Sequence, residues 1–169
     1  IICGGGLSSN AGFGIYPNSN AIGYPVLAET YSNIRHPHLS LGAYDFYIEF
    51  APKPNVIIHF GDVPLSKELN QFIASSDAEY IFHFDESGVW SDDSHLVTHE
   101  MPLSPSIIMS MFNSYDRSNS VLSTQYSTLE KNTWEVIDHE IETGAYFDGA
   151  VVYDVVDLIP DESTLFAGN

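Results

Sequence analysis

Short apolar runs alternate with segments of helical periodicity along the whole chain. The Val-Ile-Ile-His-Phe run at 56–60 is the clearest strand, because it is rich in β-branched residues and lies between Pro54-Asn55 and Gly61. The other runs are shorter and are bounded by turn residues in the same way. The pattern predicts strands over residues 1–3, 25–28, 56–60, 80–84, 96–98 and 163–167.

Helical segments fall between these strands. Asp62 can cap a helix in which apolar residues follow Leu65 at spacings of four, seven and eight, on one helical face. Valine favours strands, but the two aspartates of 151–159 lie opposite its apolar residues, so we predict a helix capped by Asp148 and stopped by Pro160. The pattern predicts helices over 43–50, after Asp62, and over 107–115, 124–143 and 151–159.

The alternation of strands and helices indicates the fold class. Near-continuous apolar strands with intervening helices are typical of a parallel sheet that is covered on both faces. Because crossovers between parallel strands are right-handed, we predict an α/β fold, a Rossmann-like three-layer sandwich with a mostly parallel sheet. The strands at 56–60 and 80–84 should be buried neighbours in that sheet.

The charge of the chain excludes several classes of partner. Acidic side chains outnumber basic ones 23 to five, and the formal net charge is −18. Nucleic acids and anionic membranes are bound through Lys and Arg, so we expect neither as a partner. No apolar run approaches the ~20 residues of a membrane span. Cys3 is the single cysteine, which excludes an intrachain disulfide and fits a reducing, cytoplasmic location.

Gly4-Gly5-Gly6 follows a predicted strand, as a dinucleotide-binding loop would. The pattern G-x-G-x-x-G fails, because Ser9 stands at the third glycine position, and a second start at Gly12 fails at Pro17. No clear helix follows that would direct its N-terminus at a pyrophosphate. A simple glycine turn is therefore the favoured interpretation, and a nucleotide- or cofactor-binding Rossmann module stays as the alternative.

Histidines and carboxylates form no recognisable metal motif, and we expect no metal site. His95 and His99 have the i, i+4 spacing of a zinc site on a helix, but the intervening Leu-Val-Thr indicates a strand or loop. His36 and His38 flank a proline and lack a third ligand nearby in sequence. A cluster of carboxylates follows the strand at 80–84 but misses the spacing of a calcium loop: Asp85, Glu86, Asp92 and Asp93.

Lys67 is one of only five basic side chains, and it lies in the first turn of the helix predicted after the strand at 56–60. A cation there opposes the helix dipole, yet the same place suits an anion, since helix N-terminal amides and the lysine would converge on it. An ordinary exposed lysine is the simpler interpretation of the spacing. The sequence contains no G-x-S-x-G elbow, no Walker loop and no Cys/His nucleophile pair, so we name no catalytic residue.

Four ordered segments resemble one family. Residues 23–35 contain G-Y-P-V-L-A-E and S-N-I-R, similar to its G-x-P-V-L-A-[DE] and S-x-x-R stretches. Residues 60–67, F-G-D-V-P-L-S-K, are similar to F-G-x-x-P-x-S-K, and residues 85–92 to D-x-x-G-x-W-x-D. Residues 164–169 resemble the L-F-x-G-N-S strand without its serine. The family is MenD, the thiamine-diphosphate-dependent 2-succinyl-5-enolpyruvyl-6-hydroxy-3-cyclohexene-1-carboxylate synthases of menaquinone biosynthesis.

The resemblance implies a part of a larger enzyme. Enzymes of this family join a succinyl-semialdehyde unit, made from 2-oxoglutarate, to isochorismate, with thiamine diphosphate and Mg²⁺ supplying the chemistry. N-terminal and C-terminal domains hold the cofactor in a homodimer or homotetramer. The chain contains no G-D-G…N motif for the cation, so the resemblance implies the central domain, at residues 1–147, which binds no cofactor and is inactive alone. Residues 148–169 are then a helix and a strand leading towards the missing pyrophosphate-binding domain.

Two positions carry over from the resemblance. Lys67 matches a lysine that reaches the substrate carboxylates, and Asn169 matches the asparagine before a substrate-contacting serine. Two positions depart from it: Glu68 and Val89 stand where some members have arginine. The second departure argues against a feedback site for a naphthoate product on this domain. A structural domain from another thiamine-diphosphate enzyme is a further alternative, against which the Lys67 and Asn169 motifs argue.

Overall fold

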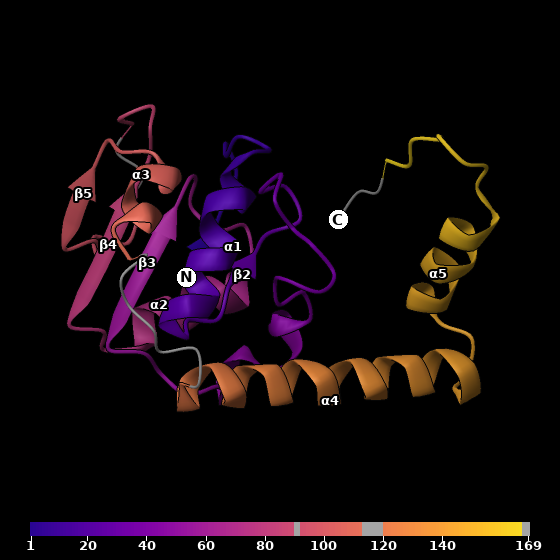
Figure 1. The fold of residues 1–169 in the computed structure, drawn as a ribbon. Coiled ribbons are helices and arrows are strands. Elements are labelled where there is room, and N and C mark those ends of the chain that lie inside the picture. Colours follow the sequence, from indigo (N-terminus) through magenta and orange to yellow (C-terminus); the bar gives the residue numbers. More distant parts are fainter. Residues whose placement is uncertain (90–91, 113–119, 167–169) are drawn as a thin grey trace. The chain divides into compact units, whose positions relative to one another are not determined.

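The computed structural model describes residues 1–89, 92–112 and 120–166, and the chain forms two compact units, Ile1–Thr133 and Trp134–Asn169. The first unit contains a five-stranded parallel sheet in the order β2-β1-β3-β4-β5 (Figure 1). β3 and β4 pair in parallel from Val56↔Tyr80 to Phe60↔Phe84, so the expected neighbours are confirmed. The strands are β1 Ile2–Cys3, β2 Leu27–Ala28, β3 Val56–Phe60, β4 Tyr80–Phe84 and β5 His99–Met101.

Helices cover the two faces of this sheet. α1 (Ala11–Ile22) and α3 (Pro105–Ser110) pack against each other on one face, and α2 (Lys67–Ser75) lies on the other with the 3₁₀ helices η1 (Tyr44–Phe46) and η2 (Ile48–Phe50) (Figure 1). The predicted Rossmann-like three-layer α/β fold is confirmed.

Side chains of the strands alternate between the two faces. Cys3, Ile58, Phe60 and Phe84 join the core beneath α1 and α3, where Phe60 is fully buried. Burial of such a side chain contributes about 1.5–3 kcal/mol. The alternate positions, which include His59 and His83, lie on the opposite face. That face therefore holds two imidazoles where aliphatic side chains would be expected.

The sequence pattern misses α1, which does follow the glycine turn. Two glycines and Pro17 lower its intrinsic helix propensity, and the proline lacks the N–H for one backbone bond. Burial of one face outweighs this cost, because the buried residues recur at helical spacing: Ala11, Ile15, Ser19 and Ile22. The expectation that no helix follows Gly4-Gly5-Gly6 is wrong.

The predicted cap of α2 is also wrong. Ser66, not Asp62, is the N-cap: its backbone is extended, with φ −60° and ψ 121°, and its Oγ accepts a hydrogen bond from the Leu69 amide at 3.0 Å. Asp62 instead remains in the loop that leaves β3. Lys67 is therefore the first residue of the helix, within the predicted first turn.

Three other expected elements differ. The helix at 43–50 is two 3₁₀ turns, whose spacing of three residues buries both Tyr44 and Tyr47. The strand expected at 96–98 begins at His99, because the Thr98 hydroxyl takes the place of a backbone acceptor for the Ile81 amide at 2.9 Å. Described residues 163–166 form no strand, since the second unit offers no described strand with which they could pair.

The later helices follow the predicted pattern more closely. α3 ends at Ser110, and residues 113–115 of the predicted helix lie outside the described residues. α4 (Val121–Thr143) and α5 (Asp148–Leu158) confirm the helices predicted over 124–143 and 151–159. Asp148 is the first residue of α5 and Phe147 holds the cap position, so the predicted cap is off by one residue. No helix in the described part of the chain is both long and apolar enough to cross a membrane.

A carboxylate on α4 holds the turn before η1. Glu130 accepts hydrogen bonds from the Gly42 amide at 2.7 Å, the Ala43 amide at 3.0 Å and the Tyr47 hydroxyl at 2.8 Å. Burial of Tyr47 and its bond to this carboxylate raise the pKa of the phenol. Tyr126, one turn earlier, is buried and donates to the Pro52 carbonyl at 2.9 Å. The first turns of α4 are thereby fixed within the first unit.

We expect Glu130→Gln to lower the free energy of unfolding by about 1 kcal/mol, the difference between a charge-assisted and a neutral hydrogen bond. The amide oxygen can still accept one of the backbone bonds, so the fold should persist. Urea denaturation of the chain measures the change. Glu142→Gln, at an exposed position of the same helix, is the control and should leave stability within ~0.5 kcal/mol. Equal stability of the two variants would contradict this role of Glu130.

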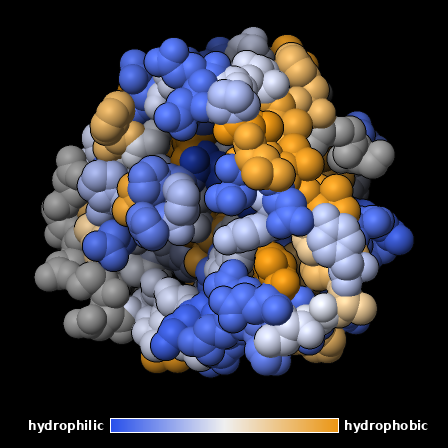
Figure 2. Space-filling view, turned by 90° about the vertical axis from the view of Figure 1, so that its right-hand side faces the viewer, coloured by the Kyte–Doolittle hydropathy of each residue, from blue (hydrophilic) through white to orange (hydrophobic). Residues whose placement is uncertain are grey.

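Apolar side chains are exposed to an unusual extent in the second unit. Figure 2 shows apolar side chains at the molecular surface. α5 exposes apolar residues over most of its circumference, which is not the pattern of a helix that faces water. Its exposed apolar residues are Val151, Val152, Tyr153, Val155, Val156 and Leu158.

Candidate functional site at the carboxyl edge of the sheet

All five strands run in one direction, so the loops that follow them gather at one edge of the sheet, where open α/β sheets bind ligands. The loops after β1 and β3 are in direct contact there. The Gly4 amide donates to the Phe60 carbonyl at 2.9 Å, and the Asp62 amide donates to the Gly5 carbonyl at 3.0 Å. The glycine turn is thus hydrogen-bonded to the start of the loop that leads from β3 to Lys67.

Close packing accounts for the glycines of this turn. A Cβ on Gly4 would lie 1.8 Å from the Asp62 carbonyl oxygen, and one on Gly5 would lie 2.4 Å from the Tyr31 ring. A Cβ on Gly6, where φ is +77°, would lie 3.5 Å from the Asp62 carboxylate. A pyrophosphate on this turn would face that carboxylate, which favours the simple glycine turn over a nucleotide site.

Lys67 opens α2 at this edge, as predicted, and its side chain is exposed. No salt bridge within the described part of the chain involves it. Two of the family-like segments meet beside it, because the Ser66 amide donates to the Glu29 carboxylate at 3.2 Å. Ser66 also donates its hydroxyl to Asp45 at 2.5 Å. These bonds fix the start of the helix and leave the ammonium group of Lys67 available to solvent.

Glu29 is the buried carboxylate of this group. Burial, the largest influence, raises its pKa, while the bond from the Ser66 amide acts in the opposite direction. The nearby Asp45 carboxylate raises the pKa of Glu29 further, because the two negative charges repel each other. The second predicted site residue, Asn169, lies outside the described residues, so its position relative to Lys67 stays a prediction.

The carboxylates after β4 are used by their own loop. Asp85 accepts bonds from the Ser87 amide and hydroxyl, both at 2.8 Å. Asp92 is buried and accepts from the Leu96 amide at 3.0 Å and the Val97 amide at 3.1 Å. Among residues 1–89, 92–112 and 120–166, no three His, Cys, Asp or Glu side chains converge as ligands of one metal ion. The donor set at this edge therefore does not fit a Mg²⁺ site.

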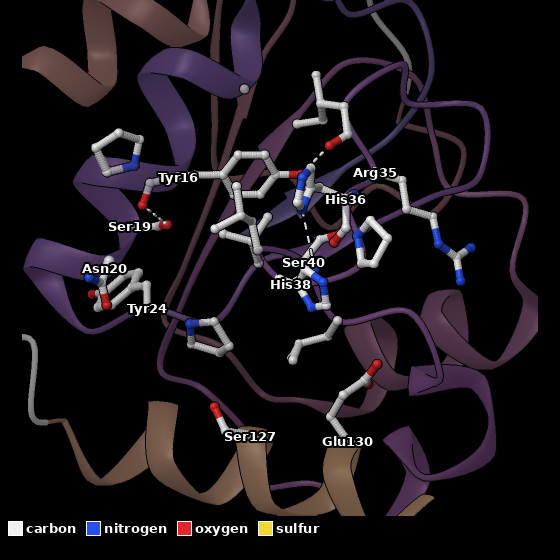
Figure 3. A pocket seen from close by; sticks show the side chains of 18 of the residues that line it. Tyr16, Ser19, Asn20, Tyr24, Arg35, His36, His38, Ser40, Ser127 and Glu130 are labelled. Carbon is white, nitrogen blue, oxygen red and sulfur yellow. Dashed lines mark hydrogen bonds between the residues drawn. The ribbon is translucent and has the colours of Figure 1, made fainter. Parts of the chain in front are cut away.

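The exposed histidines also have local roles. His95 has a φ of 55° in a loop, and His99 lies on β5 against the Phe82 ring at 4.8 Å, so their spacing does not place them on one helical face. His36 and His38 line a pocket of about 880 Å³ between α1 and the loop at 33–41 (Figure 3). The His38 amide donates to the ring of His36 at 3.2 Å, which tightens that loop.

Two charged side chains of this pocket, Arg35 and Glu130, form hydrogen bonds within its walls. Arg35 donates to the Gly42 carbonyl at 2.7 Å, and in Figure 3 its guanidinium group extends away from the two histidines. The Glu130 carboxylate already accepts the three bonds described above. The rest of the lining is mostly aliphatic, aromatic and hydroxyl-bearing, with Lys131 as a further charged side chain.

Sequence reasoning missed a pair of buried histidines behind the Lys67 loop. β3 ends in Ile-His-Phe and β4 in Phe-His-Phe, and His59 pairs in register with His83. Their rings stack with centroids 4.7 Å apart. The sequence signal was a histidine placed one residue before the end of two otherwise apolar buried strands. A polar residue at such a position needs a partner, and here both rings bond carbonyl groups of the loop after β3.

Comparison with known proteins identifies the family. No family model matches the chain. A 2-succinyl-5-enolpyruvyl-6-hydroxy-3-cyclohexene-1-carboxylate synthase of Roseiflexus castenholzii is 34% identical over 100% of this chain, and one of a Roseiflexus species is 33% identical over 87%. The synthase of Bacillus cytotoxicus is 28% identical over 87%. The chain spans 30%, 26% and 27% of these three proteins. It belongs to the MenD family, the 2-succinyl-5-enolpyruvyl-6-hydroxy-3-cyclohexene-1-carboxylate synthases.

Proposed function

We propose that the chain is the central, non-catalytic domain of a menaquinone-biosynthesis synthase that joins 2-oxoglutarate-derived succinyl semialdehyde to isochorismate. The observation that carries the proposal is the match itself: two such synthases align with 100% and 87% of the chain, while the chain covers under a third of each. A single Rossmann-like sheet in residues 1–133 agrees with one domain of a multidomain enzyme.

Lys67 is the residue that we assign to the substrate. Both proposed substrates carry two carboxylates, and a lysine at a helix N-terminus is a suitable partner for one of them. Its exposure at the ligand-binding edge supports this role, as does the absence of a described carboxylate partner. Asn169, at the end of the last family-like segment, is proposed as a second substrate contact.

Thiamine diphosphate and Mg²⁺ belong, in this proposal, to other domains of the parent enzyme. The described side chains do not fit the metal, since no three of its usual ligands converge. The glycine turn does not fit a pyrophosphate, because the Asp62 carboxylate lies beside it. We therefore derive no catalytic step from the residues of this chain.

The N-terminal and C-terminal domains of the parent are the proposed partners, in a cytoplasmic homodimer or homotetramer. The apolar surface of α5 supports such contacts, because four exposed valines together with Tyr153 and Leu158 on one short helix favour a partner surface that covers them. Nucleic acid and anionic membranes are not proposed, since the net charge of −18 opposes both.

The test compares the chain with its parent. We expect the 169-residue chain to give no product from 2-oxoglutarate and isochorismate in the presence of thiamine diphosphate and Mg²⁺, and to show no heat of cofactor binding in calorimetric titration. The parent synthase, assayed in parallel, should turn over. Turnover or micromolar cofactor binding by the chain alone would overturn the central-domain assignment.

A nucleotide-binding module is the second candidate, because α1 follows β1 and the glycine turn in the order of a dinucleotide fold. A thermal-shift screen with NAD, FAD and CoA separates the two candidates. We expect no shift with any of them. A shift of several degrees with one of these cofactors would favour the module over the synthase domain.

A further inference from the structure

Two stacked imidazoles lie directly beneath the loop that presents Lys67. His83 is completely buried and His59 is 6% exposed. His83 Nε2 lies 2.7 Å from the Gly61 carbonyl oxygen, and His59 Nε2 lies 2.9 Å from the Asp62 carbonyl oxygen. The two rings therefore hold the carbonyl groups of consecutive residues, the first two after β3.

The hydrogen-bond partners of His83 determine how many protons its two ring nitrogens must carry or share. A carbonyl oxygen only accepts, so His83 Nε2 carries a proton and donates it to Gly61. Nδ1 lies 2.7 Å from a carboxylate oxygen of Glu100, on β5. A hydrogen bond at that distance requires one more proton, either on the ring as an imidazolium or on the carboxyl group. His83 and Glu100 thus hold a shared proton, without which a ring lone pair would face a carboxylate.

His59 acts from the neighbouring strand as a neutral ring. Its Nε2 must donate to the Asp62 carbonyl for the same reason. Burial, and then the charge of the adjacent His83, lower the pKa of His59 to about 3. Besides Glu100, the other charged groups near the pair are the Asp85 carboxylate and the chain's amino group.

The backbone at this point has little freedom to compensate for a lost bond. Gly61 has a φ of +77°, and a Cβ there would lie 2.2 Å from the Gly5 carbonyl oxygen. Its amide donates to the Phe84 carbonyl at 3.1 Å. Five residues separate Gly61 from Lys67, and Ser66 anchors the far end through the cap of α2. The direction in which the chain leaves Gly61 therefore decides where Lys67 stands.

We propose that His59 and His83, with the proton shared between His83 and Glu100, form a positioning device that fixes the Gly61–Asp62 turn and so sets Lys67 for its substrate carboxylate. The role of Lys67 rests on the function proposed above. The shared proton and the fixed turn rest only on the geometry of the three side chains.

The shared proton can be observed directly. We expect ¹⁵N-correlated imidazole NMR spectra of the chain to show protons on both ring nitrogens of His83, or one on Nε2 with a strongly bonded Nδ1, from about pH 5 to 8, where an ordinary imidazole changes its charge. Glu100→Gln should leave His83 neutral, because the amide can donate to Nδ1. Loss of a proton from the His83–Glu100 pair of the wild-type chain within that pH range would overturn the proposal.

Kinetics of the parent synthase test the positioning role. Glu100→Ala should raise KM about 10-fold for the substrate whose KM rises in Lys67→Ala, with kcat changed less than twofold, since displacement of a binding group by ~1 Å has effects of this order or larger. Glu100→Gln should restore KM to within about twofold, and its KM should stay constant at alkaline pH while that of the wild type rises. A fall in kcat equal to that in kcat/KM would overturn the positioning role.

The substrate role of Lys67 and the positioning role of the two histidines with Glu100 can be contradicted independently of each other. Unchanged kinetics in Lys67→Ala would overturn the substrate role of the lysine and leave the NMR result as the test of the shared proton. A clear effect of Lys67→Ala together with a wild-type KM in Glu100→Ala would overturn positioning alone. If Glu100→Ala does not fold, the comparison of Glu100→Gln with the wild type across pH decides, because equal KM profiles would overturn the proposal.

Discussion

Replacement of Lys67 by alanine in the parent synthase should lower kcat/KM by about 10- to 150-fold. A charge-assisted hydrogen bond to a substrate carboxylate contributes about 1.5–3 kcal/mol, and its loss translates into that range. The helix itself should not suffer, because Lys67 is exposed and the cap of α2 is made by Ser66. Removal of a cation from a helix N-terminus is, if anything, slightly stabilising. Steady-state kinetics with each substrate varied in turn measure the effect, and thiamine diphosphate affinity should barely change.

Two variants make this experiment specific. Lys67→Arg keeps a cation at the site and should recover part of the loss, although its planar group differs in geometry from an ammonium. Lys53→Ala removes another exposed lysine, one that bonds the Ser75 carbonyl at the end of α2, and should leave kcat/KM unchanged. Equal losses in the two alanine variants would point to a general effect of charge, and no loss in Lys67→Ala would return Lys67 to an ordinary surface lysine.

The sheet was predictable from the sequence because its strongest signals are local. The central strands, β3 and β4, are β-branched or aromatic runs between turn residues, and the structure has them with the predicted bounds. The spacing of aspartates and apolar residues over 151–159 predicted α5 from an equally local pattern, and α4 also lies where a helix was predicted. By contrast, α1 contains residues of low helix propensity, and its stability comes from packing, which a local pattern does not report.

The site was predictable only in part. The placement of Lys67 followed from the strand before it and from the helical spacing after Leu65, both short-range features, although the cap predicted at Asp62 was wrong. The His59–His83 pair required knowledge of which strands are neighbours and of their register, since the two residues are 24 positions apart in the chain. Thr98 moved the start of β5 for a similar reason: its hydroxyl bonds a strand 17 residues away. Such long-range polar contacts leave little trace in hydrophobic periodicity.

Acid should destabilise the chain through His59, which is buried as a neutral ring. Its pKa is about 6.5 when unfolded and is lowered to about 3 in the fold, by burial first and by the charge of His83 second. Between these values the unfolded state binds a proton that the folded state does not, so stability is fully present above pH 6.5 and is lost as pH falls. The slope is about 1.4 kcal/mol per pH unit, which amounts to about 2 kcal/mol between pH 6.5 and 5.

A control variant separates the contribution of His59 to the pH dependence of stability from that of the 23 acidic side chains. His59→Gln removes the titrating ring while an amide remains available to bond the Asp62 carbonyl, so the variant should be less stable at pH 7 but lose less stability on acidification. We expect urea denaturation at pH 7, 6 and 5 to give a gap between wild type and variant that narrows by about 2 kcal/mol. Parallel pH profiles would mean that His59 takes up its proton in the folded state, and then a cation would have to be accommodated beside the His83–Glu100 pair. The same data would therefore decide whether His59 is the neutral member of the pair.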